Sequence, residues 1–376
     1  MARKTADRRT ITDRAGATEN GSPALAPRYA LPEDPAAGLG PASVHVGDCR
    51  QVLPRLGLSG GVDLIFADPP FNWSRNYDRA PAGAALGVQA AARGPAAVWR
   101  DDMPEAEYLA FTYSWLSACV SSLRPGGTLW VNVPDDWAAE IVVWMKGRGL
   151  GGHGGEGVAG VAGVAGGPPA EMIMPRGGWC VWHYRFGQNR TRDGGDAAFV
   201  NSKVHALCFV KAPLAARCWR PLRVLEPSDR ATVYADPRTR SKRDGFPPGM
   251  RVPLDVWYGP GWGRVQGNNA ERAAGDFAHD NQLPEAYLER VVLACSDEGG
   301  LVLDPFVGSG TTGVVARAYG RRFVGVEYSA ANAASAARRI GAGMAHKGVY
   351  LNRSSATARP RGSSTIASEP LAAACT

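Results

Sequence analysis

The feature that most constrains this chain is an apolar run followed by a glycine-rich turn and a helix-like segment, at residues 300–319. The run 300–303 ends in Asp304, and residues 304–313 read Asp-Pro-Phe-Val-Gly-Ser-Gly-Thr-Thr-Gly. Glycines let the backbone approach a ligand closely, and the unpaired N–H groups at a helix N-terminus attract one. The stretch predicts a strand, a turn and a helix of an α/β sheet, with a nucleotide-like ligand at the turn.

The glycines of this turn also match a second pattern. Gly308, Gly310 and Gly313 fit the G-x-G-x-x-G of dinucleotide sites, and Glu327 follows at about the distance of a ribose-binding acid. In a dinucleotide site the glycines come straight after the strand, whereas here residues 304–307 intervene. The turn alone therefore leaves a dinucleotide-dependent oxidoreductase open.

A second apolar run, Val62–Ala67, is followed by Asp68-Pro69-Pro70-Phe71. With this motif the chain resembles the DNA amino-methyltransferases, which methylate adenine N6 or cytosine N4 using S-adenosylmethionine. The family's acceptor motif, D-P-P-Y/F, matches residues 68–71, and its cofactor motif, D-P-F-x-G-S-G-T-T, matches residues 304–312. The acceptor motif comes first, which is the order of the family's β group.

The resemblance covers about residues 43–150 and 276–342, including Gln282-x-Pro284-Glu285. It implies an α/β fold class: a Rossmann-like sheet of an S-adenosylmethionine-dependent methyltransferase, with circularly permuted motifs and an inserted target-recognition region. Predicted strands and helices alternate along both segments, which is typical of a parallel sheet covered on both faces. We expect both motifs to lie on one sheet.

Particular residues carry the expected roles. The resemblance implies that Asp48, in a Gly-Asp pair after a short predicted strand, contacts the adenine of the cofactor; the alternative is an ordinary turn aspartate. The residues expected to bind S-adenosylmethionine are Asp48, Asp304, Pro305, Phe306, Gly308, Ser309, Gly310, Thr311 and Glu327. The residues expected to be catalytic are Asp68, Pro69, Pro70 and Phe71.

The chemistry explains why the acceptor motif needs these residue types. An exocyclic amine is a poor nucleophile because its lone pair is delocalised into the ring. Asp68 and the Pro69 carbonyl can each accept a hydrogen bond from the amine and aim its lone pair at the methyl group. The two prolines hold the backbone by fixing φ, and Phe71 offers a flat face to a base turned out of the duplex.

The substrate is less constrained than the reaction. In the family, Asp at the first motif position favours adenine and Ser favours cytosine, so Asp68 predicts adenine N6, with cytosine N4 as the alternative. RNA carries the same amines and stays open. A non-catalytic nucleic-acid-binding protein is a further alternative, which binding of S-adenosylmethionine would exclude.

Positive charge is concentrated in one part of the chain. Residues 182–251 contain 14 Lys and Arg against 6 Asp and Glu, a net charge of +8, while the whole chain carries +7. Basic residues interleaved with aromatic ones are typical of a nucleic-acid-binding face, although a solvated, salt-bridged surface is the alternative. The residues expected to bind double-stranded DNA are Arg190, Arg192, Lys203, Arg238, Arg240, Lys242 and Arg243.

Composition shifts predict the domain organisation. We expect a disordered basic arm at 1–41, the acceptor half of the catalytic domain at 42–211 with a flexible Gly/Ala-rich insertion at 147–170, a target-recognition region at 212–275, the cofactor half at 276–345, and a disordered tail at 353–376.

Other features narrow the class of protein. The seven cysteines are scattered without a C-x-x-C pair and the six histidines show no ligand spacing, so we expect buried thiols and no metal site. The sequence contains no apolar run long enough for a membrane span and no signal-peptide pattern. We therefore expect a cytoplasmic, nucleoid-associated protein without a membrane partner, and leave a homodimer open.

Overall fold

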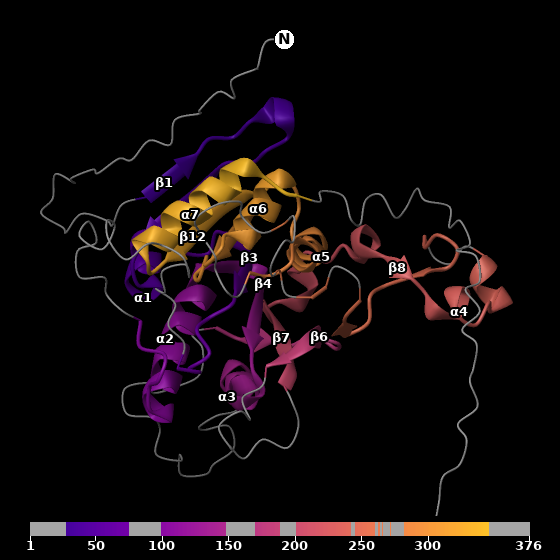
Figure 1. Cartoon of the computed structure of the whole chain (residues 1–376), viewed down its shortest axis with the longest axis horizontal. Helices are drawn as coiled ribbons and strands as arrows, with labels where there is room; N and C mark the ends of the chain where they lie inside the picture. Colours follow the sequence, from indigo (N-terminus) through magenta and orange to yellow (C-terminus); the bar gives the residue numbers. More distant parts are fainter. Residues whose placement is uncertain are drawn as a thin grey trace, which may run out of the picture.

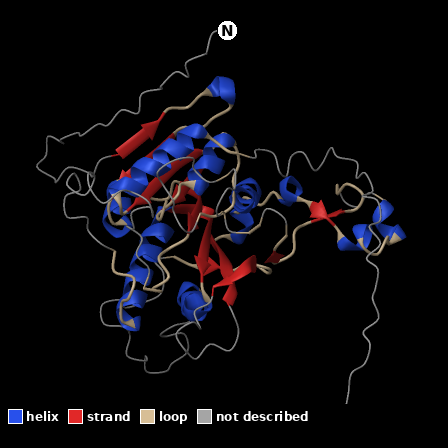
Figure 2. Cartoon of the chain, in the orientation of Figure 1, coloured by secondary structure: helices blue, strands red, loops and turns tan. Residues whose placement is uncertain are grey.

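The computed structural model describes residues 28–74, 99–147, 170–188, 201–241, 245–259, 262–263, 265, 271 and 282–345. The Gly/Ala-rich insertion predicted at 147–170 lies outside this part except at its two ends, and the predicted tail lies wholly outside it. A ten-stranded sheet forms the centre of the molecule, with helices on both of its faces (Figures 1 and 2).

The strands of this sheet are β1 (Arg28–Leu31), β2 (Ala42–Val46), β3 (Val62–Ala67), β4 (Leu123–Val133), β5 (Met172–Ile173), β6 (Trp179–Gln188), β7 (Asn201–Lys211), β10 (Val256–Trp257), β11 (Leu301–Asp304) and β12 (Arg322–Glu327). A separate pair is formed by β8 (Glu226–Pro227) and β9 (Met250–Arg251).

The described helices are α1 (Cys49–Val52), α2 (Glu105–Ser122), α3 (Asp135–Met145), α4 (Asp229–Thr232), α5 (Glu285–Cys295), α6 (Thr311–Ala318) and α7 (Ala330–Ala342). Short 3-10 helices are η1 (Pro35–Ala37), η2 (Leu53–Arg55), η5 (Leu214–Ala216), η6 (Pro221–Val224) and η7 (Pro237–Arg240).

The strand order confirms the permuted sheet. It runs β1-β2-β12-β11-β3-β4-β7-β6-β10, with β5 beside β7. Strands β2, β12, β11, β3 and β4 are mutually parallel, and β7 is antiparallel to β4. Late strand β11 pairs with early strand β3, Val302 opposite Leu64. The two motif-bearing halves therefore form one sheet, and β2 lies on the cofactor side, next to β12.

Alternating side chains of the strands build two cores. Leu64 and Phe66 of β3 belong to the core under α5, α6 and α7, while Ile65 and Ala67 belong to the core under α1, α2 and α3. All four side chains are fully buried. This is why β3 reads as a continuous apolar run, as a parallel strand covered on both faces should.

Part of the segment predicted as a disordered basic arm, 1–41, belongs to the fold. Residues 28–31 form β1, which pairs with β2 in antiparallel register. Tyr29 and Leu31 pack against the core, and a Cβ at Gly40 would lie 2.0 Å from the carbonyl oxygen of Arg321. The alternation of charged and small residues concealed a short edge strand held by a few apolar contacts. Residues 1–27 lie outside the described part.

Helix α5 differs from the one-sided helix that its apolar spacing predicts. Every residue from Glu285 to Cys295 is buried, because the helix packs against α6, the sheet and η6. Pro284 precedes the helix as its N-cap instead of lying in its first turn. In α3, likewise, the N-cap is Pro134, and Asp135 is the first helical residue.

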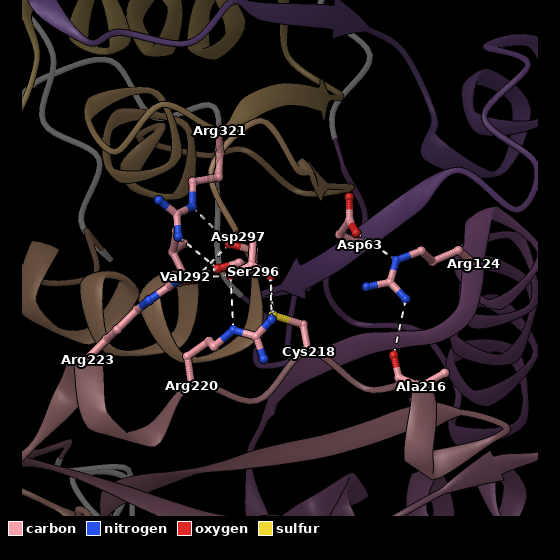
Figure 3. A network of polar contacts seen from close by, with 10 residues as sticks. All are labelled: Asp63, Arg124, Ala216, Cys218, Arg220, Arg223, Val292, Ser296, Asp297 and Arg321. Carbon is pink, nitrogen blue, oxygen red and sulfur yellow. Dashed lines mark hydrogen bonds and ion pairs between the residues drawn. The ribbon is translucent and has the colours of Figure 1, made fainter. Parts of the chain in front are cut away.

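A polar network attaches the start of the segment 212–275 to the central sheet and to the end of α5 (Figure 3). Asp297, which follows α5, lies 2.8 Å from Arg220 and 2.9 Å from Arg223. Arg124 of β4 donates to Asp63 of the neighbouring strand β3 at 2.6 Å and to the carbonyl oxygen of Ala216 at 3.4 Å. Residues 216–223 are therefore fixed to the sheet.

Two glycines, one in α6 and one in α7, test how closely these helices pack against their neighbours. A Cβ at Gly313 of α6 would lie 2.6 Å from Ile340 and 2.7 Å from Phe323, so Gly313→Ala should lower the free energy of unfolding by about 1–3 kcal/mol. Gly341 of α7 has room, with its nearest neighbour at 3.5 Å, and Gly341→Ala should raise stability by up to about 1 kcal/mol. Urea unfolding compares the two, and equal effects would contradict the packing of α6.

Candidate active site

Three carboxylates meet at one edge of the sheet because their parallel strands end there. Asp68 follows β3, Asp304 ends β11 and Glu327 ends β12. A pocket at this edge is lined by residues of both sequence motifs, namely Asp68, Pro69, Pro70, Phe71, Asp304, Pro305, Phe306, Val307, Gly308, Ser309, Thr311 and Thr312, together with Asp48 and Glu327. Of the residues predicted for the cofactor and for catalysis, Gly310 is the one that does not line this pocket.

The glycine turn has the backbone geometry that its sequence predicts. Gly308 and Gly310 both adopt positive φ, at 50° and 82°, and Gly310 is the N-cap of α6 without a side-chain cap. A Cβ at Gly310 would also lie 3.1 Å from that of Ala336. Gly313 instead faces Ile340 and Phe323. The third glycine of the apparent G-x-G-x-x-G therefore serves helix packing.

Glu327 is oriented by the turn it faces. One carboxylate oxygen accepts from the Gly308 N–H at 2.9 Å and the other from the Ser329 N–H at 3.1 Å. The residue is only 8% exposed. The oxygen that accepts from Ser329 also accepts from the Asn332 side-chain amide at 3.4 Å. These contacts fix the orientation of the carboxylate at the pocket wall.

The Asp304 carboxyl is buried, and its pKa is raised to about 7. Burial is the main cause, the charges of Asp68 and Glu327 add to the rise, and hydrogen bonds from Thr312 and from the Phe306 N–H oppose it. The Phe306 N–H lies 2.9 Å from its Oδ1. Four acids line this pocket, Asp48 among them, and they favour a ligand that brings positive charge.

Asp48 has the contacts of an ordinary turn aspartate, while its predicted contact with the cofactor stays a prediction. Its carboxylate caps α1 by accepting from the Arg50 N–H at 2.9 Å, and it also binds the Arg50 guanidinium, with a contact of 2.6 Å. It nevertheless lines the pocket. The Arg50 guanidinium lies over the ring of Phe111, 5.0 Å from its centroid.

Aromatic residues that the sequence analysis missed line the same pocket. Trp99 contacts Phe111, with ring centroids 4.8 Å apart, and Tyr328 at 5.6 Å. Trp99 follows an Ala/Gly-rich stretch, and Phe111 reads as a core residue of a helix, so no pattern signalled them. Only Tyr328, next to Glu327, had a position that suggested the site.

The acceptor motif is held from outside by hydrogen bonds to its backbone. The Tyr108 hydroxyl donates to the Pro70 carbonyl at 2.7 Å, and the Trp137 indole donates to the Phe71 carbonyl at 3.1 Å. Asn72, with φ of 59°, donates its N–H to Asp101 at 2.9 Å. These contacts fix the turn that follows β3.

A buried layer lies behind Asp68. Val131 pairs with Ala67, so the next residues, Asn132 and Asp68, are neighbours across β4 and β3. The Tyr287 hydroxyl donates to Asn132 at 2.6 Å, and burial raises the pKa of Tyr287, with the Asp68 charge adding to the rise. Trp182 stacks near Tyr287 and lines the pocket from β6. Sequence spacing gave no signal for these partners, because they lie on other elements.

Three of the seven residues predicted to bind DNA are described: Lys203 lies in β7, and Arg238 and Arg240 lie in η7. Lys203 pairs with Asp135, Arg238 pairs with Asp236 at 2.8 Å, and Arg240 is exposed. The other predicted residues, Arg190, Arg192, Lys242 and Arg243, lie outside the described part of the chain.

Other basic residues of the stretch 182–251 are engaged within the protein. Arg220 and Arg223 bind Asp297, and Arg251 binds Glu226 and Asp229. The positive charge counted along residues 182–251 is therefore larger than the positive charge that the described residues of this stretch leave available to a partner.

The permuted sheet and its two-motif pocket are those of an α/β protein with a ligand site at the carboxyl ends of its parallel strands. The family model described as DNA methylase matches residues 62–338, and the chain belongs to this N6/N4 methylase family. It is thus a DNA methyltransferase, and S-adenosylmethionine is the methyl donor of this class.

Curated relatives agree with this assignment. The type II methyltransferase M.ScaI of Streptomyces caespitosus is 27% identical over 273 residues, covering 70% of each chain. M.HpaI of Haemophilus parainfluenzae is 25% identical, covering 71% of this chain and 64% of its own. M2.DpnII of Streptococcus pneumoniae is 52% identical over 73 residues, which cover 19% of this chain and 25% of its own.

Solved structures are more distant. The cytosine-N4-specific PvuII DNA methyltransferase aligns at a TM-score of 0.49 with 16% identity, covering 79% of this chain and 86% of that one. The complex of M1.HpyAVI with S-adenosylmethionine aligns at 0.42 with 16% identity, covering 79% and 98%.

In the described part of the chain, no group of three or more metal-ligating side chains is placed to hold an ion. No helix there combines the length and the apolar character that a bilayer span requires. Six of the cysteines are described; they are buried and unpaired.

The raised pKa of Asp304 predicts a pH dependence of stability in the absence of cofactor. A carboxyl in the unfolded chain titrates near pH 4, so the folded state holds its proton more tightly and loses stability as pH rises from about 4 to about 7. The variant Asp304→Asn has no carboxyl at this position and so lacks this pH-dependent loss. The free energy of unfolding of the variant minus that of the parent should therefore increase by about 2–3 kcal/mol from pH 5 to pH 8. Urea unfolding at both pH values measures the difference, and a constant difference would contradict the raised pKa.

Proposed function

We propose that this protein transfers a methyl group from S-adenosylmethionine to the N6 amine of an adenine turned out of double-stranded DNA. The observation that carries the proposal is the shared pocket, which brings residues 68–71 and residues 304–312 together although more than half of the chain separates them. The order of β3 and β11 in the sheet accounts for this proximity.

The residues at one end of the pocket fit the cofactor. Glu327 presents a fixed carboxylate to a ribose, and the rings of Trp99, Phe111 and Tyr328 offer apolar walls for an adenine. Asp304 lies at the end of β11, where a sulfonium or an ammonium group would relieve the crowding of acids. When bound, S-adenosylmethionine supplies an electrophilic methyl group.

The residues at the other end fit the amine. Asp68 is half-buried, and the Pro70 and Phe71 carbonyls are already engaged by Tyr108 and Trp137. We assign Asp68 and the Pro69 carbonyl as the two acceptors for the amine hydrogens. Phe71, whose ring lies edge-on to Trp73 with centroids 5.2 Å apart, is assigned to stacking with the base.

The base is the finer part of the proposal. Asp at the first motif position supports adenine, and cytosine N4 is the alternative. Duplex DNA and RNA incubated with the protein and labelled cofactor, then digested to nucleosides and analysed by mass spectrometry, decide among them. N6-methyladenine from DNA is expected; N4-methylcytosine or a methylated ribonucleoside would replace this part of the proposal.

Asp68→Ala separates chemistry from cofactor binding. Loss of the acceptor should lower the rate of methyl transfer by about 10²–10⁴-fold, while the Kd for S-adenosylmethionine measured by calorimetry stays close to that of the parent. Asp102→Ala is a matched control, because Asp102 is an exposed acid paired with Arg100 at 3.1 Å. Near-native turnover of the Asp68 variant would exclude its role in activating the amine.

We also propose that residues 212–275 recognise the target sequence. Beyond α5, α4 and β8 form a small lobe at the right of Figure 1. At the end of α4, Val233 and Tyr234 are 68% and 75% exposed, and the exposed Arg240 follows in η7. An exposed aromatic beside arginines suits contact with bases and phosphates.

The change of Arg238, Arg240, Lys242 and Arg243 to Ala together tests this face. Four independent phosphate contacts would add about 3.6 to the log-log salt slope, and we expect a smaller loss because Arg238 is already paired with Asp236. Arg176→Ala, at an exposed position before β6, is the control. Unchanged affinity for duplex DNA and an unchanged salt slope would place the DNA elsewhere.

A further inference from the structure

The glycine turn accepts hydrogen bonds from an arginine of α7 that no sequence motif indicated. Arg339 of α7 is only 7% exposed. Its Nη1 donates to the Ser309 carbonyl at 3.1 Å and to the Thr311 hydroxyl at 2.7 Å, and its Nη2 donates to Glu285 at 3.3 Å. One guanidinium therefore joins the turn, the first residue of α6 and the first residue of α5.

Glu285 balances this charge in the interior. It is 1% exposed, and its second oxygen accepts from the Ala345 N–H at 2.9 Å. Removing two charges from water costs free energy that their attraction repays only in part, so a buried ion pair is weak evidence of a contribution to stability. The fork of the guanidinium does, however, fix the direction of every group that it binds.

Hydrogen bonds of the turn backbone, from Gly310 N–H to the Val307 carbonyl at 2.8 Å and from Gly308 N–H to Glu327 at 2.9 Å, leave the Ser309 carbonyl and the Thr311 hydroxyl to Arg339. Gly308 and Gly310 adopt positive φ, and no side chain caps α6. The Thr311 hydroxyl, expected from the sequence to face the cofactor, donates to the Leu283 carbonyl at 3.2 Å and accepts from Arg339. Thr311 thus connects the turn to the segment before α5.

We propose that Arg339, with its charge balanced by Glu285, is a positioning residue that holds the Gly308–Gly310 turn in the shape that binds the cofactor. The inference rests on the proposed use of S-adenosylmethionine in this pocket. Arg339 acts through Ser309 and Thr311 and has no contact with the reacting atoms. Its effect belongs to cofactor affinity, whereas that of Asp68 belongs to methyl transfer.

Arg339→Met keeps most of the side-chain volume and removes the donors. The Kd for S-adenosylmethionine, measured by calorimetry on the full chain, should rise at least tenfold. The KM for the cofactor should rise with it, while kcat at saturating cofactor stays within about threefold of the parent. Arg338→Met is the matched control, because Arg338 is the exposed neighbour on the same helix. Equal affinity of the two variants would overturn the inference.

A second variant separates positioning from folding. Arg339→Met leaves the buried Glu285 carboxylate without its cation and is expected to destabilise the fold. The double variant Arg339→Met/Glu285→Gln removes that charge and should regain urea resistance, yet still bind the cofactor at least tenfold more weakly than the parent. If affinity returns together with stability, Arg339 is only structural and the inference is wrong.

The conservative change adds a third readout. Arg339→Lys keeps the charge but cannot donate to Ser309, Thr311 and Glu285 with one planar group, so its affinity should fall between those of the parent and Arg339→Met. A parent protein that fails to bind S-adenosylmethionine contradicts the proposed function itself. A parent that binds, with all Arg339 variants equal to it, contradicts only the role of Arg339.

Discussion

The pairing of β11 with β3 is the interaction on which the rest of the molecule depends. It brings a late strand beside an early one, Val302 opposite Leu64 and Leu303 opposite Ile65. Parallel strands end at the same edge, so whatever follows each of them meets there. The reaction needs a donor and an acceptor within reach of each other, and this backbone ladder supplies that proximity before any side chain takes part.

Proximity of strand ends also gathers acids, and the protein manages their repulsion by different means. Backbone N–H groups of Gly308 and Ser329 donate to the Glu327 carboxylate. The Phe306 N–H and Thr312 donate to Asp304, yet burial outweighs them, and the pKa of Asp304 rises to about 7. A cationic ligand at this edge would oppose that rise. Affinity for such a ligand follows from the way the sheet is assembled.

The sequence predicted those parts of the site that lie in continuous motifs. Asp68 and Asp304 each follow an apolar run, and the positive φ of Gly308 and Gly310 follows from the need for a tight turn. Both stretches could therefore be predicted from local sequence.

Trp99, Tyr287 and Asn132 could not be predicted in this way, because their positions depend on which elements pack together. The edge strand β1 was not predicted either, because a strand of four residues is too short to show a periodic pattern of apolar residues.

Charge counted along the chain differs from charge presented at the surface, and the structure shows the physical cause. A count along the chain registers Arg220, Arg223 and Arg251 as available cations, yet Asp297 lies outside the counted stretch and binds two of them. Ion pairs form between residues distant in sequence, so a local surplus is not a surface surplus. The same logic governs Arg339, whose charge looks ordinary on an amphipathic helix but is balanced by Glu285 from another element. The role proposed for Arg339 depends on the groups that its guanidinium binds, and these come from α5 and the glycine turn, so the sequence around Arg339 does not show them.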